Sequence, residues 1–301
     1  MPTLPMTPPM IFLQLTINAL IAGAMYALVA AGFSLIYATS RFVHFAHGAV
    51  VGAGAYIFFA LFSRLDWPAS LATMATLLLA GFLGLVLYGL IYEPLMRRKA
   101  SAVILLIASI GLLILINNSF LLIFGADVQT IDIVGWHEGI DLFGAVITKL
   151  QLLIIAVAAV LFVLLQLVMK RTRWGATVRA VADNPELALI AGIPVRRVQA
   201  TGFALGSALA AVAGILIGLE QNIEPYMGVQ LIIKGYTGAV IGGVTSLPGA
   251  VAGSFLVGAA ENYGIWYLPS GYKDAIAFVL LLVFLIARPQ GILGINKGIR
   301  Q

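Results

Sequence analysis

The stretch IFLQLTINALIAGAMYALVAAGFSLIY occupies residues 11–37 and contains no Asp, Glu, Lys or Arg. About 20 apolar residues in a helix cross the roughly 30 Å hydrocarbon core of a bilayer, so this stretch predicts a transmembrane helix. Apolar blocks of similar length recur at residues 46–62, 68–92, 102–124, 150–169, 198–219 and 249–268. Two weaker segments, residues 229–243 and 275–287, are shorter. Together these segments predict eight or nine crossings, depending on whether residues 229–243 span the bilayer or re-enter it.

The composition of the whole chain leads to the same fold class. Of its 301 residues, 61% are hydrophobic and 10% are charged, whereas soluble domains are about half apolar and about a quarter charged. A water-soluble globule is thereby excluded. We expect an all-α polytopic membrane protein, with a single transmembrane domain over residues 1–301 and a lipid bilayer rather than nucleic acid as the surface that its basic charge meets. The chain contains no cysteine, which excludes disulfides and thiolate catalysis.

The distribution of Lys and Arg predicts which loops face the cytoplasm, because positively charged loops are retained on that side. One loop holds Arg97, Arg98 and Lys99, and another holds Lys170, Arg171, Arg173, Arg179, Arg196 and Arg197. The loop over residues 125–144 instead carries acidic residues and no Lys or Arg, so it is expected outside. Arg288, Lys297 and Arg300 predict a cytoplasmic C-terminus. The N-terminus, which has no Lys or Arg, is placed outside.

Glycine is dense at two places in the apolar blocks. The residues are Gly48, Gly52 and Gly54 in one group, and Gly235, Gly238, Gly242, Gly243, Gly249 and Gly253, together with Pro248, in the other. Small residues at such spacing allow helices to pack closely. Alternatively, each group marks a broken helix, because interrupted hydrophobic segments in the two halves of a transporter are typical of its binding site. On this interpretation we expect interrupted helices near residues 45–55 and 235–250.

Few ionisable side chains fall within or beside the predicted spans. They are Glu220, Glu224, Lys234, Glu261, His44 and His47. Glu261 lies well inside a span, where an unpaired charge costs about 2.5–3.5 kcal/mol, so it is expected to have a partner or a wet cavity. Its role is either functional or that of a hydrogen bond between helices, whereas Glu220 and Glu224 are expected at the interface. The two histidines lie three positions apart but lack a third ligand, so no metal site is predicted.

The sequence contains no motif for chemistry of its own. A phosphate-binding G-x-x-x-x-G-K-S/T loop is absent, and no nucleophile and base pair falls within the spans. We therefore expect a non-catalytic chain that needs no cofactor. An ion-coupled secondary transporter is the alternative class, and it would depend on Glu261 as the acidic group near the midplane.

Residues 171–197 contain the signals of a short cytoplasmic helix. Asp183 and Asn184 are capping residues, Pro185 suits the first helical position, Glu186 favours the positive N-terminal end, and Gly192 suits the position after the helix. The residues between these signals are apolar and include Leu187 and Ile190. A helix this short is not stable alone. It is expected to dock on a partner, on this protein's own helix ends, or in the lipid headgroups.

Three groups of motifs, in order along nearly the whole chain, resemble one family. The first group is NALIAGAMYAL at residues 18–28, FAHG at 45–48 and GAY at 54–56. The second is RAVADNPE at 179–186, GI at 192–193, RV at 197–198 and FALGSALA at 203–210. The third is KGYT at 234–237, GGVTSLPGA at 242–250 and YKD at 272–274. With these motifs the chain resembles the LivH-type permease subunit of the branched-chain amino acid ABC importers.

The resemblance implies half of an importer in the prokaryotic cell (inner) membrane. Its partners would be a second, LivM-type permease, two cytoplasmic ATPases of the LivG and LivF type that use the ATP and Mg, and an external or periplasmic solute-binding protein. Residues 171–197 would be the cytoplasmic coupling segment, with Arg179, Asp183, Asn184, Pro185, Glu186, Leu187, Ile190 and Gly192 facing an ATPase. The substrate pathway is predicted to involve Phe45, His47, Gly48, Gly242, Gly243, Pro248 and Glu261.

The chain departs from the family pattern on both sides of the FAHG motif. His44 stands where the family commonly has Asn, and Ala49 stands where it commonly has an acidic or polar residue. The solute implied is an amino acid of the branched-chain type or a related small polar or carboxylate compound. The resemblance does not choose among these, because the binding protein makes most of the selection.

Overall fold

The computed structural model describes residues 8–133 and 135–294, so Lys297 and Arg300 lie outside the described residues. Over these residues the fold is all-α apart from one hairpin and one isolated bridge, because a helix satisfies its own backbone groups in hydrocarbon. The helices are α1 (Pro8–Ser40), α2 (Ala46–Phe59), α3 (Ala69–Leu87), α4 (Glu93–Arg97), α5 (Ala102–Phe124), α6 (Lys149–Arg171), α7 (Arg173–Asp183), α8 (Pro185–Ile190), α9 (Val195–Gln221), α10 (Met227–Gly242), α11 (Leu247–Gly264) and α12 (Lys273–Ala287). Two π-helical turns, η1 (Ala60–Arg64) and η2 (Tyr88–Tyr92), extend α2 and α3, and a 3-10 turn, η3 (Ser270–Tyr272), precedes α12.

Seven of the described helical segments are long and apolar enough to cross a membrane. They are built on α1, α2, α3, α5, α6, α9 and α12. Helices α10 and α11 pass the same test only as a pair, and the pair is bent by 118°. The predicted count of eight is reached when this bent pair is taken as one span. A count of nine would require each arm to cross by itself.

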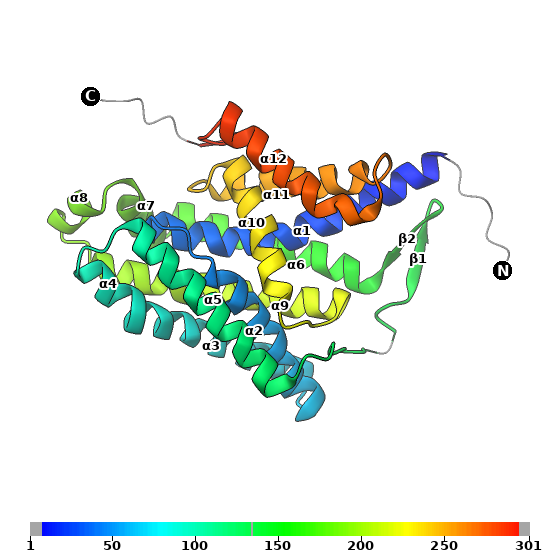
Figure 1. The fold of residues 1–301 in the computed structure, drawn as a ribbon, viewed down its shortest axis with the longest axis horizontal. Helices are drawn as coiled ribbons and strands as arrows, with labels where there is room; N and C mark the ends of the chain where they lie inside the picture. Colours follow the sequence, from blue (N-terminus) through cyan, green and yellow to red (C-terminus); the bar gives the residue numbers. More distant parts are fainter. Residues whose placement is uncertain (1–7, 134, 295–301) are drawn as a thin grey trace.

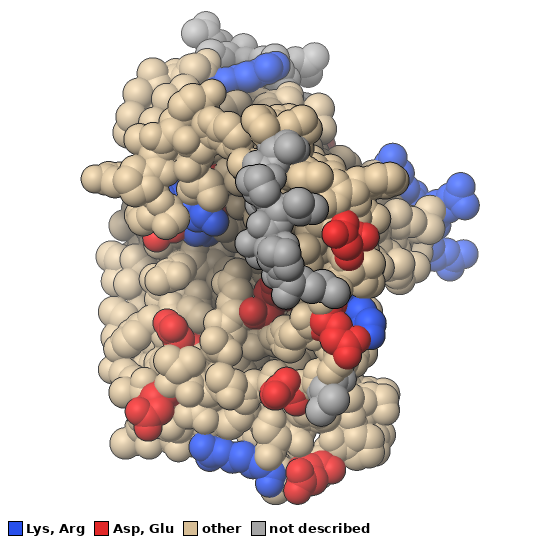
Figure 2. Space-filling model, turned by 90° about the vertical axis from the view of Figure 1, so that its right-hand side faces the viewer, with Lys and Arg blue, Asp and Glu red and all other residues tan. Residues whose placement is uncertain are grey.

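The basic segment and the acidic loop lie at opposite ends of the molecule (Figure 1). Helices α7 and α8, which belong to the basic segment, lie at one end, close to α4. The hairpin of β1 (Gly139–Leu142) and β2 (Ala145–Thr148) lies at the other end, beside the start of α1. Acidic side chains are scattered over this second end (Figure 2). The fold thus separates the predicted cytoplasmic and external loops.

The hairpin was not predicted from the sequence. Its strands are antiparallel, with Gly139 opposite Thr148 and Leu142 opposite Ala145. Phe143 and Gly144 form the two-residue turn, with φ of 57° and 87°, as the favoured hairpin turns require. The Gln14 amide fixes the hairpin to α1: its Nε2 donates to the Val146 carbonyl at 3.1 Å, and its Oε1 accepts from the Val146 N–H at 2.8 Å.

Helix α1 is the central element of the bundle. Of its most apolar stretch of 18 residues, 89% is buried inside the protein. It packs most extensively against α11 and α9. Glycine makes the close approach possible, because a Cβ at Gly23 would meet Phe255 of α11, and a Cβ at Gly206 of α9 would meet Ile36 and the Gly32 carbonyl of α1. By contrast, only 11% of the corresponding stretch of α6 and 6% of that of α12 are buried. These two helices are therefore left facing lipid or another chain.

The two predicted helix interruptions have different outcomes. The one at 235–250 is present, between the end of α10 at Gly242 and the start of α11 at Leu247. The one at 45–55 is wrong as placed, because α2 runs unbroken through Gly48, Gly52 and Gly54. The actual break comes just before it, at residues 41–45, which are not helical. The glycines of α2 pack instead: a Cβ at Gly48 would meet the Gly228 carbonyl, and one at Gly54 would meet Ala211.

Candidate functional site

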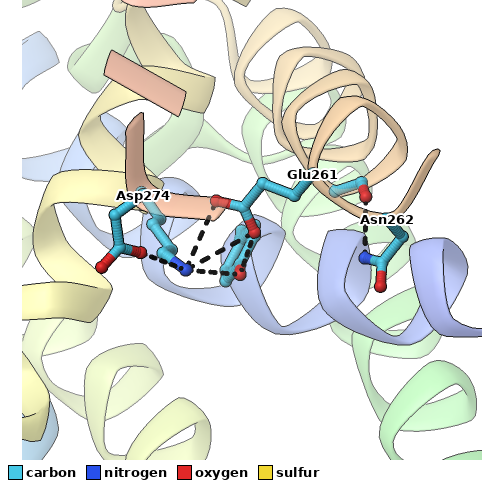
Figure 3. Close-up of polar contacts among 6 residues, drawn as sticks. Glu261, Asn262 and Asp274 are labelled. Carbon is cyan, nitrogen blue, oxygen red and sulfur yellow. Dashed lines mark hydrogen bonds and ion pairs between the residues drawn. The ribbon is translucent and has the colours of Figure 1, made fainter. Parts of the chain in front are cut away.

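A cluster of three charged side chains and one tyrosine, on α1, α10, α11 and α12, extends from the interior of the apolar bundle to its surface (Figure 3). Glu261 of α11 is 1% exposed, and its Oε1 lies 3.3 Å from Nζ of Lys234 on α10. The Tyr26 hydroxyl of α1 donates to Glu261 Oε2 at 2.7 Å. The expectation that Glu261 has a partner is therefore confirmed, and the partner is a lysine in the same interior.

A second carboxylate shares the same ammonium. Asp274 Oδ1, in the first turn of α12, lies 2.9 Å from Lys234 Nζ. Lys234 also donates to the Tyr26 hydroxyl at 3.2 Å and lies 5.4 Å from the centre of the Tyr26 ring. The Asp274 side chain is 59% exposed, in contrast to that of Glu261. Lys234 thus connects a buried anion with an anion at the surface, and it is itself partly exposed.

The FAHG residues lie at the start of α2 and contact α10. The Phe45 ring lies 5.7 Å from the Tyr236 ring, centre to centre. His47 is buried, and its Nε2 lies 3.2 Å from the Val29 carbonyl of α1. Gly48 packs against the backbone of α10 at Gly228. These residues do not contact Glu261 directly. Helix α10, however, packs against both α2, which carries them, and α11, which carries Glu261.

The residues between α10 and α11 form a tightly packed corner. Gly243 has φ of 110°, a conformation that favours glycine. The Ser246 hydroxyl caps α11 by accepting from the Gly249 N–H at 3.2 Å, and Pro248 lies in the first turn. A Cβ at Gly242 would collide with the Gly249 carbonyl. Close packing therefore accounts for Gly242, and the predicted place of Gly242, Gly243 and Pro248 in a pathway stays a prediction.

His44, which stands where the family pattern has Asn, is buried in the non-helical segment before α2. Its Nδ1 lies 2.9 Å from the Tyr92 hydroxyl. The Ser109 hydroxyl bonds the same segment: it accepts from the Phe45 N–H at 3.1 Å and donates to the Val43 carbonyl at 3.4 Å. Among the described residues, His, Asp and Glu form no group of three that could hold a metal. This segment illustrates that irregular backbone at membrane depth needs protein around it.

The short helix of the basic segment forms where the sequence predicts it, as α8. Asn184 is its N-cap, with Oδ1 accepting from the N–H groups of Glu186 at 3.0 Å and Leu187 at 3.1 Å. Pro185 is the first helical residue, and Gly192 has φ of 81° just after the helix. Asp183 ends α7 rather than capping α8. The break between α7 and α8 falls at Asn184, so Asp183 belongs to α7.

One face of helix α8 packs against the rest of the protein, and the other face is exposed. Ala188 is buried in a small cluster with residues of α1, α7 and α9, among them Leu35 and Val198. Leu187 and Ile190 are exposed, Ile190 to 82%. Pro185, Glu186, Leu189, Pro194, Val195, Arg196 and Arg197 line a groove beside the helix. The protein's own helix ends therefore cover one face of α8 and leave most of its apolar side chains uncovered.

The backbone before α8 is held by a contact that the sequence did not reveal. The Arg41 guanidinium, on the residue just after α1, donates to the Ala182 and Asp183 carbonyls. Arg179 lies on α7, which precedes this contact. Because α1 also carries Tyr26, one helix contacts both the charged cluster and the basic segment. Tyr26 as a partner of Glu261, and Asp274 as a second partner of Lys234, were not predicted, although both lie in motifs quoted above, because sequence spacing carries no signal for contacts between distant helices.

Comparisons with known proteins agree over nearly the whole chain. The family described as "Branched-chain amino acid transport system / permease component" matches residues 15–285. The chain is 36% identical over 300 residues to the high-affinity branched-chain amino acid transport system permease protein LivH of Salmonella typhimurium, covering 94% of this chain and 96% of that protein. It is 35% identical over 299 residues to the permease protein BraD of Pseudomonas aeruginosa, with the same two shares.

A solved structure supports the fold alone. The structure described as PsaBC from Streptococcus pneumoniae in complex with Fab has a TM-score of 0.51 and 17% identity, over 91% of this chain and 92% of that one. The matched family is a transport permease and not a family of catalysts. Together with its apolar helices, the similarity makes the chain a multi-pass protein of the cell (inner) membrane. The chain belongs to the family of permease components of branched-chain amino acid transport systems.

Proposed function

We propose that this permease is half of the translocation unit of an ATP-driven importer for amino acids of the branched-chain type. The observation that carries the proposal is the match to LivH over 94% of the chain. On this proposal a second, related permease completes the pathway, two ATPase subunits bind at the α7 and α8 end, and an external binding protein delivers the solute. The chain performs no bond chemistry of its own.

Helix α8 is the proposed ATPase contact. It has six residues, too few to be stable alone, yet two of its apolar side chains, Leu187 and Ile190, are exposed. An apolar surface at the cytoplasmic end, flanked by Arg196 and Arg197, suits a groove on a partner subunit. Its firm capping by Asn184 and its anchoring through Ala188 let a displacement of α8 reach α1 and α9.

Purification of the assembled transporter from its host in mild detergent tests the proposal. Recovery of two ATPases, a second permease and solute-stimulated ATPase activity is the expected result. Recovery of this chain alone, with uptake driven by an ion gradient and without ATP, would instead favour a secondary transporter that uses the Lys234 and Glu261 pair.

Three variants of α8, one of them a matched control, sharpen the test. Ile190→Asp places a charge on the exposed face and is expected to abolish ATPase co-purification, whereas Ile190→Leu, the matched control, keeps the apolar surface and the association. Both chains should insert normally, because the side chain is 82% exposed. Glu186→Lys reverses the charge at the start of the helix and should uncouple ATP hydrolysis from uptake. Normal coupling and ATPase recovery in Ile190→Asp would remove α8 from the interface.

A further inference from the structure

A polar pocket lies beside the charged cluster, on the external side of the bundle. Its walls come from the end of α9, the loop that follows, α10, α1 and the start of α12. The loop residue Ile223 pairs with Gln129 of the acidic external loop, which places the pocket at the hairpin end. The pocket volume is about 230 Å³. It lies below the roughly 300–1,000 Å³ of pockets for drug-sized ligands, so its size suits a small solute.

The lining combines both signs of charge with an apolar wall. Lys234 and Lys273 supply cations, and Glu224 supplies an anion. Ile217, Met227 and Leu231 supply the apolar surface. An α-amino acid with an apolar side chain presents a carboxylate, an ammonium and a hydrocarbon group, each of which matches one of these three kinds of lining.

The two carboxylate partners of Lys234 differ in how firmly they are held. Glu261 is 1% exposed and is fixed by the Tyr26 hydroxyl at 2.7 Å. Asp274 is more than half exposed, and it is held by the ion pair with Lys234 at 2.9 Å. An exposed ion pair contributes little stability, so Asp274 can leave at small cost while Glu261 stays. Lys234 therefore has one permanent anion and one exchangeable anion.

We propose that this pocket is an external binding site for a zwitterionic α-amino acid. The substrate carboxylate replaces Asp274 on Lys234, the substrate ammonium pairs with Glu224, and the side chain packs on Ile217, Met227 and Leu231. Lys273, at the edge of the pocket, attracts the carboxylate as it enters. This inference rests on the proposed function, because it assigns to the permease a site for the solute it transports.

Exchange at Lys234 also links the pocket to the bundle. When Asp274 is released, the ion pair between α10 and the first turn of α12 is lost, while the contacts of α10 with α1 and α11 through Tyr26 and Glu261 persist. Binding thus weakens the attachment of α12 to α10 at this point. Occupancy of the pocket would in this way favour one of two arrangements of α12.

Cysteine protection tests the site directly, because the chain has no cysteine of its own. Gln230 is exposed and lines the pocket, so Gln230→Cys can be labelled from outside by a membrane-impermeant maleimide in right-side-out vesicles that hold the whole transporter. L-leucine is expected to slow the labelling. Leucinamide, which lacks the carboxylate, and 4-methylpentanoate, which lacks the ammonium, should give at least about tenfold weaker protection, as expected for the loss of a charged hydrogen bond.

Three variants of the Gln230→Cys chain, two single and one double, separate the roles of the charged groups. Asp274→Asn removes the competing carboxylate and should lower the leucine concentration that gives half protection. Glu224→Gln should raise it about tenfold. The double variant Lys234→Met with Glu261→Gln removes both buried charges together, so the bundle is not left with an unpaired carboxylate, and it should abolish protection. Asp127→Asn, an exposed acid in the external loop, is the matched control and should change nothing.

The failure of this site can be distinguished from the failure of the proposed function. If leucine gives no protection, or protects as well when its carboxylate is amidated, the site is wrong, and ATP-driven leucine uptake by the same vesicles would leave the proposed function intact. If protection is normal but uptake requires an ion gradient and no ATP, the site stands and the importer proposal fails. If Asp274→Asn raises the leucine concentration that gives half protection, the proposal that leucine replaces Asp274 on Lys234 is overturned.

Discussion

The carboxylate of Glu261 and the ammonium of Lys234 lie 3.3 Å apart between two arms of a bent helix pair, one on α11 and one on α10. Each charge lowers the free-energy cost of burying the other, because removing an ion from water without a partner is costly. Tyr26 completes the arrangement from α1. The bent pair is thereby joined electrostatically to the central helix.

Lys234→Met should destabilise the protein strongly. It leaves the Glu261 carboxylate buried without its cation, and breaking one half of a buried pair costs about 3–5 kcal/mol. Thermal unfolding in detergent, with size-exclusion chromatography as the readout of folded protein, measures the effect.

Two controls separate charge from packing in that experiment. Glu261→Gln in the Lys234→Met background should restore much of the stability, because no unpaired charge then remains. Asp274→Asn should shift the melting temperature only slightly, since an exposed pair contributes about 0–1 kcal/mol. Equal losses in the single and double variants would mean that packing, not charge, explains the effect.

Asn184→Ala should loosen α8. Its side chain accepts two backbone N–H groups of the first turn, and loss of such a cap costs about 0.5–2 kcal/mol. In a helix of six residues this loss is large relative to its own stability. Hydrogen exchange over residues 185–190 should rise, with ATPase coupling reduced in parallel. Asn184→Ser keeps a capping oxygen and should retain both properties; unchanged exchange in the alanine variant would contradict the capping role.

Gly242→Ala should disrupt the corner between α10 and α11. Its Cβ would collide with the Gly249 carbonyl, which is backbone and cannot rotate away. Gly111→Ala on α5 is the matched control, because a Cβ there meets nothing within 4 Å. We expect low yield or a melting temperature lowered by several degrees for the first variant, and no loss for the second. Equal stability of the two would show that the corner can open, as a substrate pathway would require.

Tyr92→Phe should weaken the non-helical segment before α2. The hydroxyl is a partner of the buried His44 ring at 2.9 Å, and leaving a buried polar atom without a partner costs about 1–3 kcal/mol. Tyr267→Phe is the control, since that side chain is 86% exposed. Comparison of the two unfolding temperatures checks the expectation, and the prediction fails if the two variants melt alike.

The sequence determined the elements that depend on local physics. Blocks of about 20 apolar residues predict the spans because the bilayer fixes their length. The basic residues near α8 and the acidic loop predict the two ends of the molecule, since charge sets orientation. Asn184, Pro185 and Gly192 predict α8, because capping involves only neighbours along the chain. All of these signals lie within one helix or one loop.

Only the tertiary structure decided which distant groups meet. Glu261 needed a partner on energetic grounds, but nothing in the sequence spacing indicated that Lys234 and Tyr26 contact it, or that Asp274 shares Lys234 with it. In the same way, glycine content could not distinguish the unbroken α2 from the corner after Gly242, because a small residue serves both for close packing and for a bend. Contacts between helices depend on how whole helices pack, and sequence periodicity does not carry that information.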